Sequence, residues 1–140
     1  MTVAGRCHCG NVELRFETSA PAETLQVRAD TCSFCRRHGA RTTSDPGGRV
    51  EITVHAADDL IRYRFALKTA DFLVCARCGV YVAAVSTEGG SSYATVNINA
   101  LEDPERFAQA VPVTYDGETE AERRARRAAR WTPAVLRVGA

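Results

Sequence analysis

The chain has 140 residues, of which 45% are hydrophobic and 25% charged, and its formal net charge at pH 7 is +1. These values are ordinary for a single globular domain and argue against a disordered or fibrous chain. Because positive and negative charges nearly cancel, the chain has no overall electrostatic attraction to nucleic acid or to a membrane surface. No apolar run approaches the roughly 20 residues that cross a bilayer.

Short stretches in which apolar and polar residues alternate occupy most of the chain. A period of two indicates half-buried strands. These stretches fall at residues 12–16, 25–29, 50–54, 61–65, 72–75, 80–85 and 94–98. Breakers rich in glycine and serine at 44–48 and 88–92 indicate turns between them. The pattern predicts a mostly β domain built of antiparallel sheets.

Helical signals are confined to the C-terminal third. Asp103 and Pro104 are typical of an N-cap followed by the first residue of a helix, here one or two turns long. Residues 118–130 are rich in Ala, Glu and Arg, which are good helix formers, and their apolar face offers only alanines. We therefore divide the chain into a domain over residues 1–117 and a helical C-terminal tail over residues 118–140.

The arginines of this tail invite comparison with a nucleic-acid interface. Glutamates partly offset the five arginines between residues 123 and 130, so we interpret them as a solvated helix face with intrahelical ion pairs. Strongly salt-dependent DNA binding would support the other interpretation. We expect no nucleic-acid partner.

Six cysteines are the most informative feature of the composition. No secretory signal precedes Cys7, so we expect a cytoplasmic protein, and stable disulfides are rare in that compartment. Paired cysteines there indicate metal or redox chemistry. They form three clusters: Cys7-His8-Cys9-Gly10, Cys32-Ser33-Phe34-Cys35 and Cys75-Ala76-Arg77-Cys78-Gly79.

The first and last clusters predict one closed structural zinc site. Zinc takes four ligands in a tetrahedron, and a tight turn can present two thiolates to one ion. A glycine after the second cysteine allows a positive φ, which turns backbone N–H groups toward the sulfurs. Cys7, Cys9, Cys75 and Cys78 would fill the coordination sphere and leave no room for a substrate. The alternative is a set of buried or disulfide-bonded cysteines.

The middle cluster supplies only two thiolates, from Cys32 and Cys35. Asp30 lies two residues before Cys32 and can serve as a third ligand, with His38 as a second candidate. Three protein ligands and an open position are typical of catalytic zinc. The alternative is a metal-free dithiol or a reversible disulfide.

Six segments of the chain together match the motifs of a known family. They are Gly5–Val12 (G-x-C-H-C-G), Cys32–Ala40 (C-S-x-C-R-R-x-G-A), Leu60–Phe65 (L-x-x-Y-x-F), Cys75–Gly79 (C-x-x-C-G), Asn97–Leu101 and Tyr115–Gly117. This set, spread over about residues 3–117, resembles the glutathione-dependent formaldehyde-activating family, also called the GFA or CENP-V domain family. The resemblance implies an Mss4-like fold held by structural zinc, with the middle cluster as the second metal site. Members with the complete middle motif have C-x-C-x-x-C, and Asp30 occupies the first of those positions here.

The resemblance also implies a zinc-dependent enzyme similar to carbon–sulfur lyases, which condenses a small thiol such as glutathione with formaldehyde or a related aldehyde. Asp30, Cys32 and Cys35 would hold the catalytic zinc. Arg36, Arg37 and His38 could attract carboxylates of the thiol, and the alternative is that they form a solvated basic turn. Aspartate is a harder ligand and a poorer partner for thiolate chemistry. The alternative is therefore a non-catalytic, zinc-stabilised binding module whose second metal site is altered or empty. We expect a monomer or homodimer with no membrane partner.

Overall fold

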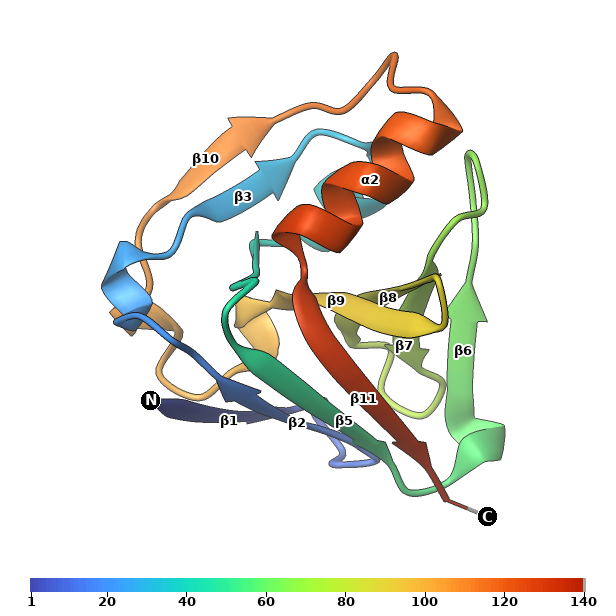
Figure 1. Ribbon diagram of the computed structural model, residues 1–140. Coiled ribbons are helices and arrows are strands. Elements are labelled where there is room, and N and C mark those ends of the chain that lie inside the picture. Colours follow the sequence, from blue (N-terminus) through green and yellow to red (C-terminus); the bar gives the residue numbers. More distant parts are fainter. Residues whose placement is uncertain (140) are drawn as a thin grey trace.

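The computed structural model describes residues 1–139, and these form a mostly β molecule with two α-helices (Figure 1). The strands are β1 (Thr2–Arg6), β2 (Val12–Glu17), β3 (Val27–Asp30), β4 (Thr42–Thr43), β5 (Arg49–Val54), β6 (Leu60–Tyr63), β7 (Asp71–Cys75), β8 (Tyr81–Glu88), β9 (Ser91–Asn97), β10 (Ala110–Val113) and β11 (Thr132–Val138). The helices are α1 (Ser33–His38) and α2 (Glu120–Arg130), and 3-10 turns lie at Ala22–Thr24, Ala57–Asp59, Ile98–Ala100 and Pro104–Arg106. The predicted mostly β class is confirmed.

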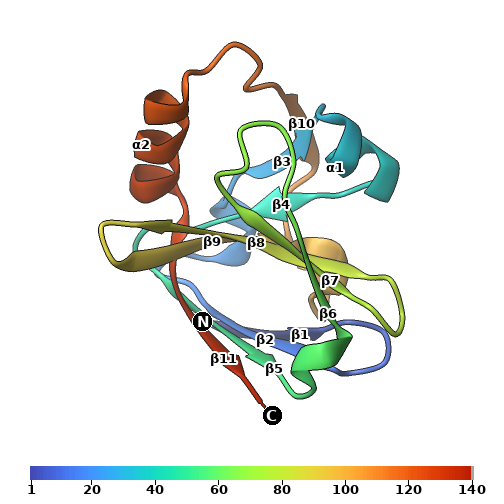
Figure 2. The same cartoon turned by 90° about the vertical axis from the view of Figure 1, so that its right-hand side faces the viewer.

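Two layers of strands enclose the main core (Figure 2). One layer holds β1, β2, β5 and most of β11, and the other is built on β6, β7, β8 and β9. Alternation places Leu14 and Phe16 of β2 inward, where the register pairs them with Ile52 and Val50 of β5. All four side chains are buried, as the period of two predicts for strands with one solvated face.

Two strand pairs are parallel, so the expectation of purely antiparallel sheets is wrong. β10 pairs with β3, and β11 pairs with β5. Parallel neighbours need a long crossover connection, and in both pairs the chain returns to the earlier strand after more than seventy residues. Local alternation reveals a strand but not the direction of its distant partner.

The expectation of a helical tail over residues 118–140 is wrong for its second half. α2 matches the prediction, but residues 132–138 form β11, which lies between β5 and β9. Thr132 pairs with Ala94, and Leu136 with Ile52. Pairing with two strands stabilises an extended segment whose own pattern, interrupted by Pro133, is weak.

Two helical details also differ from the prediction. α1 lies outside the C-terminal third, and it ends at Gly39, whose left-handed φ of +57° closes a six-residue helix. Asp103 has a φ of +53° and makes no side-chain capping bond, so Pro104–Arg106 forms a single 3-10 turn where one or two helical turns were expected.

α2 lies against β8 and β9, and its buried residue is an arginine, where the sequence predicted an alanine face. Thr119 and Glu122 form a capping box that starts the helix, with reciprocal bonds of 3.0 and 3.1 Å. Ala121 and Ala125 are exposed, whereas Arg127 is buried. The interpretation of the arginines as a wholly solvated face is therefore wrong. None of the helices within residues 1–139 has the length and apolar character to span a membrane.

Candidate metal centres

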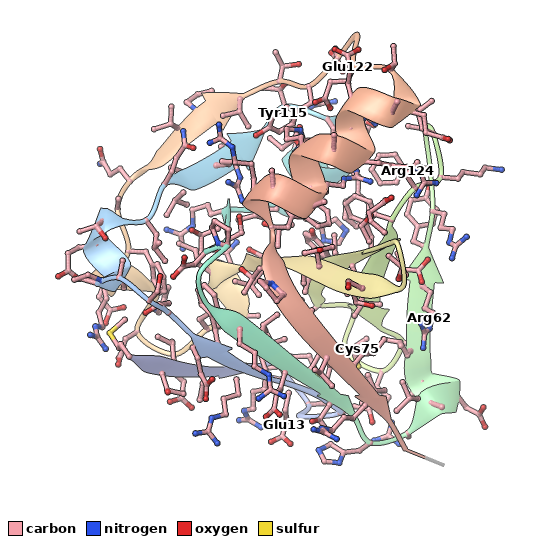
Figure 3. All side chains as sticks on the ribbon, viewed as in Figure 1. Glu13, Arg62, Cys75, Tyr115, Glu122 and Arg124 are labelled. Carbon is pink, nitrogen blue, oxygen red and sulfur yellow. The ribbon has the colours of Figure 1, made fainter. Side chains whose placement is uncertain are left out.

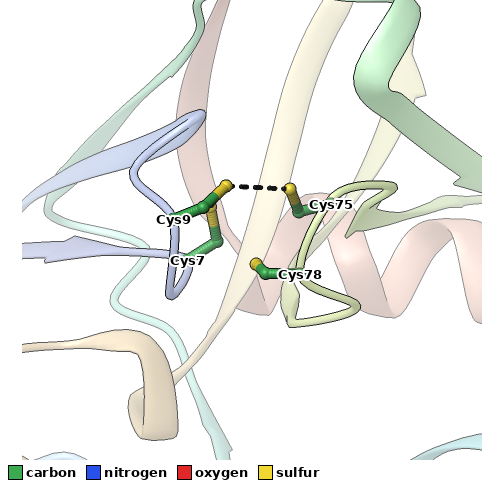
Figure 4. A group of neighbouring side chains, drawn as sticks. All are labelled: Cys7, Cys9, Cys75 and Cys78. Atoms are coloured by element: carbon green, nitrogen blue, oxygen red, sulfur yellow. Dashed lines mark hydrogen bonds between the residues drawn. The ribbon is translucent and has the colours of Figure 1, made fainter.

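Two hairpin turns bring four cysteines together (Figure 4). The β1–β2 turn carries Cys7 and Cys9. Cys75 ends β7, and Cys78 lies in the turn that leads to β8. All four Sγ atoms lie within 4.8 Å of one another, with Sγ–Sγ distances of 3.8 Å for Cys7–Cys9 and 3.6 Å for Cys9–Cys75. Tetrahedral Zn–S bonds of about 2.3 Å place sulfurs ~3.8 Å apart. The four thiols therefore fit a zinc ion, and the cluster is the one that the sequence predicted.

Backbone geometry supports this cluster from both turns. Gly10 and Gly79 have φ values of +87° and +78°, as expected for the glycine after each second cysteine. The N–H of Gly79 donates to the carbonyl of Cys75 at 2.8 Å, and the N–H of Val12 donates to the sulfur of Cys7 at 3.3 Å. The cysteines form no disulfide within the described chain.

The thiols of this cluster differ in acidity. Burial, with the neighbouring thiols of Cys9 and Cys78, raises the pKa of Cys75 to about 12. Burial also opposes ionisation of Cys78, but N–H groups of Cys9 and Val80 and the nearby thiols outweigh it and lower its pKa to about 6. Cys78 thus offers a thiolate at neutral pH, and a bound cation would displace the proton of Cys75.

The second group lies where β3 meets α1. Asp30 ends β3, and its Oδ1 accepts a hydrogen bond of 2.9 Å from the N–H of Cys32. The Cys32 sulfur accepts from the N–H of Cys35 at 3.3 Å and caps α1. Ligand atoms of Asp30, Cys32 and Cys35 lie within 4.8 Å of one another, and three donors leave a fourth zinc position open. His38 is outside this group and packs its ring on Phe34, with centroids 4.5 Å apart.

The two thiols of the second group are coupled. The Cys35 thiol donates toward Cys32, and this bond, helped by N–H groups of Cys35 and Phe34 against the effect of burial, lowers the pKa of Cys32 to about 7. The same bond and burial raise the pKa of Cys35 well above its usual range. At neutral pH Cys32 is therefore partly ionised, while Cys35 keeps its proton.

A cavity of about 120 Å³ opens beside this second group and is covered by α2. Asp30 and Cys32 line it, with Phe65 and Phe72 as apolar walls. A smaller hollow of about 50 Å³ shares Asp30 and Phe72 and extends to Cys35. The five most prominent hollows of the described chain include these two, and none of the five is lined by a cysteine of the four-cysteine cluster. The second group is therefore placed to meet a small molecule.

The cations around this cavity are not those that the sequence indicated. The basic turn over residues 36–38 is exposed and lines neither hollow. Arg123, Arg126 and Arg127 of α2 line the cavity instead, and the Arg126 guanidinium lies 3.5 Å from the ring centroid of Tyr115. Figure 3 shows Tyr115 near α2. The sequence contained a sign that these arginines face inward. Residues 123, 127 and 131 are four apart, so they share one helix face, and Trp131 is buried.

The fold and the two groups of candidate metal ligands together define a mostly β protein with one closed and one open candidate metal site. The family model described as glutathione-dependent formaldehyde-activating enzyme matches residues 2–116, so the chain belongs to that family and the resemblance is confirmed. A crystal structure of a Rhodobacter sphaeroides protein is similar, with 30% sequence identity, a TM-score of 0.57, and coverage of 79% of this chain and 99% of that one. A search among curated proteins gave no match. α2 and β11 lie beyond the segment that the family model matches.

Proposed function

We propose that this protein binds zinc in both cysteine groups and condenses a small thiol with formaldehyde or a related aldehyde. One observation carries the proposal: a three-donor group with an open fourth position borders a cavity, in a chain of the formaldehyde-activating family. The four-cysteine group, whose four thiols would fill the coordination sphere of a zinc ion, takes the structural role.

The reaction needs no oxidant or reductant. A bond forms between the thiol sulfur and the carbonyl carbon, the C=O double bond becomes single, and the thiol proton ends on the oxygen. Zinc held by Asp30, Cys32 and Cys35 would supply Lewis acidity and lower the pKa of a nearby thiol.

The chain itself shapes the space in which this happens. Phe65 and Phe72 give the cavity apolar walls that limit water around the reacting groups. Tyr81 lines the smaller hollow, and its buried hydroxyl has no hydrogen-bond partner within residues 1–139. Burial, together with the nearby thiols, raises the pKa of Tyr81 well above its usual range, so the hydroxyl stays protonated and can donate to an oxygen in the hollow.

Asp30 is the departure from the family motif and the point at which the proposal can fail. Its carboxylate is a competent zinc ligand, although it is harder than the thiolate it replaces. If Asp30 does not retain zinc, the protein is a zinc-stabilised binding module with an empty second group.

The test follows adduct formation from glutathione and formaldehyde by exchange NMR, using zinc-loaded protein, with thiol binding measured by calorimetry. We expect the wild type to accelerate the reaction and Asp30→Ala to lose at least about tenfold of that effect, since the loss of one ligand disturbs the metal. Asp58→Ala is the matched control, because Asp58 is exposed in the Ala57–Asp59 turn and borders no described cavity. A zinc-loaded wild type that neither binds thiols nor changes the rate would contradict the proposal.

A further inference from the structure

Arg127 is a buried cation with an unused donor. Arg127 is only 6% exposed, and one terminal nitrogen of its guanidinium donates a hydrogen bond to the hydroxyl of Thr69. Its guanidinium lies 4.8 Å from the ring centroid of Trp131. The Nε–H has no hydrogen-bond partner among residues 1–139, although the side chain lines both hollows beside Asp30. A buried charge left without a counter-ion is costly, so this arrangement points to an anion that completes it.

Arg28 of β3 faces the same hollow and also lacks a carboxylate partner. Its terminal nitrogen donates to the hydroxyls of Ser44 and Thr95, at 2.7 and 3.1 Å, and no ion pair within residues 1–139 involves it. Guanidinium groups stay protonated in folded proteins, so both side chains carry a positive charge at neutral pH.

The neighbouring arginines of α2 are satisfied differently. Arg123 and Arg126 both pair with Glu118, at 3.3 and 2.8 Å, and Arg124 pairs with Glu88 at 2.8 Å. Among the arginines of α2 that line the cavity, Arg127 is thus the one without an ion pair within residues 1–139.

We propose that Arg127 and Arg28 form a subsite for a carboxylate, so that the thiol handled at the second group is a small anionic one. The thiol part of this inference rests on the proposed function, whereas the anion subsite does not. Guanidinium groups suit the flat, two-oxygen carboxylate because they donate two parallel bonds. Size agrees as well: the hollows of about 50 and 120 Å³ hold a short acid, since one water in the liquid occupies roughly 30 Å³.

The first test compares 3-mercaptopropionate with 3-mercaptopropanol, thiols of equal chain length, by calorimetry on zinc-loaded protein. We expect the acid to bind at least about tenfold tighter than the alcohol, because a hydrogen bond to a charged group usually contributes that much to affinity. Arg127→Gln should abolish this preference. Arg124→Gln is the matched control, because it makes the same charge change on the same helix at a side chain paired away from the hollow with Glu88.

A second test needs no variant, since Arg127→Gln could fail to fold. Sodium propionate is titrated into the wild-type protein while the Nε–H signal of Arg127, assigned through bonds, is followed by NMR. A saturable shift supports the subsite even if no thiol binds, in which case the proposed function fails and this inference stands. If the acid and the alcohol bind equally and the Nε–H signal does not move, the two arginines are only counter-charges of the second group and the inference is overturned.

Discussion

The two cysteine groups of this protein differ in the number of secondary-structure elements that supply their ligands. Two hairpin turns from opposite layers supply the four-cysteine group, and hydrogen-bonded strands hold both turns. A single strand–helix junction supplies Asp30, Cys32 and Cys35, beneath a helix that does not belong to the matched family segment. The group that joins two layers is closed, whereas the group at a single junction stays open toward a cavity.

The largest difference is expected when one cysteine of each group is replaced. Cys78→Ser removes a ligand that joins the layers, and apparent binding energies of structural zinc, on the order of 10 kcal/mol, rival the whole stability of a domain. We therefore expect Cys78→Ser to lose cooperative thermal unfolding, as measured by circular dichroism.

Cys32→Ser is the partner experiment in the open group. Loss of the Cys32 thiol should leave the melting transition cooperative, because Cys32 is not part of the core between the two layers. Unfolding of Cys32→Ser together with survival of Cys78→Ser would reverse the roles that we assign to the two groups.

Trp131 connects α2 with the open group and should have the next largest effect. It is 6% exposed and packs in the cluster that contains Cys35 and Tyr81. Trp131→Ala should lower the free energy of unfolding by about 3–5 kcal/mol, the usual cost of emptying a buried aromatic site, as measured by urea denaturation. It should also weaken zinc binding in the open group only.

Val138→Ala is the control for that substitution, since Val138 lies at the end of β11 and is 41% exposed. Its free energy of unfolding should change by no more than about 0.5 kcal/mol. Equal losses from Trp131→Ala and Val138→Ala would show that β11, and not packing at the open group, determines the effect.

Glu118 should have the smallest effect, and its effect should depend on pH. Hydrogen bonds and charge from Arg126 and Arg123 lower the pKa of Glu118, so it contributes stability above its ordinary range near 4.5 and loses it as the pH falls through the lowered value. Glu118→Gln should cost about 1 kcal/mol at pH 7. Urea denaturation at several pH values should show the two proteins converging below pH 4.5. A constant difference across this range would contradict the ionic explanation.

Much of the fold follows from local pattern, and the failures share one cause. Alternation identifies β2 and β5, and cysteine–glycine spacing identifies the closed group, because both signals lie within a few adjacent residues. β11 depends on partners in β5 and β9, which no local pattern reveals.

The same limit applies at the open group. Spacing alone brought Asp30, Cys32 and Cys35 together, but α1 is capped by a cysteine sulfur rather than by one of the usual polar residues. Arg127 is buried through contacts with residues distant in the sequence, such as Thr69. The composition of the helix shows none of these contacts, and it therefore predicted a solvated arginine.

Native mass spectrometry of the zinc-saturated protein tests the central claim most directly. We predict two zinc ions for the wild type and for Asp58→Ala, and one for Asp30→Ala, with the melting temperature of Asp30→Ala within a few degrees of the wild type because the closed group remains filled. One zinc ion in the wild type and in Asp30→Ala alike would contradict an open metal centre at Asp30, Cys32 and Cys35, and the enzymatic proposal would fall with it.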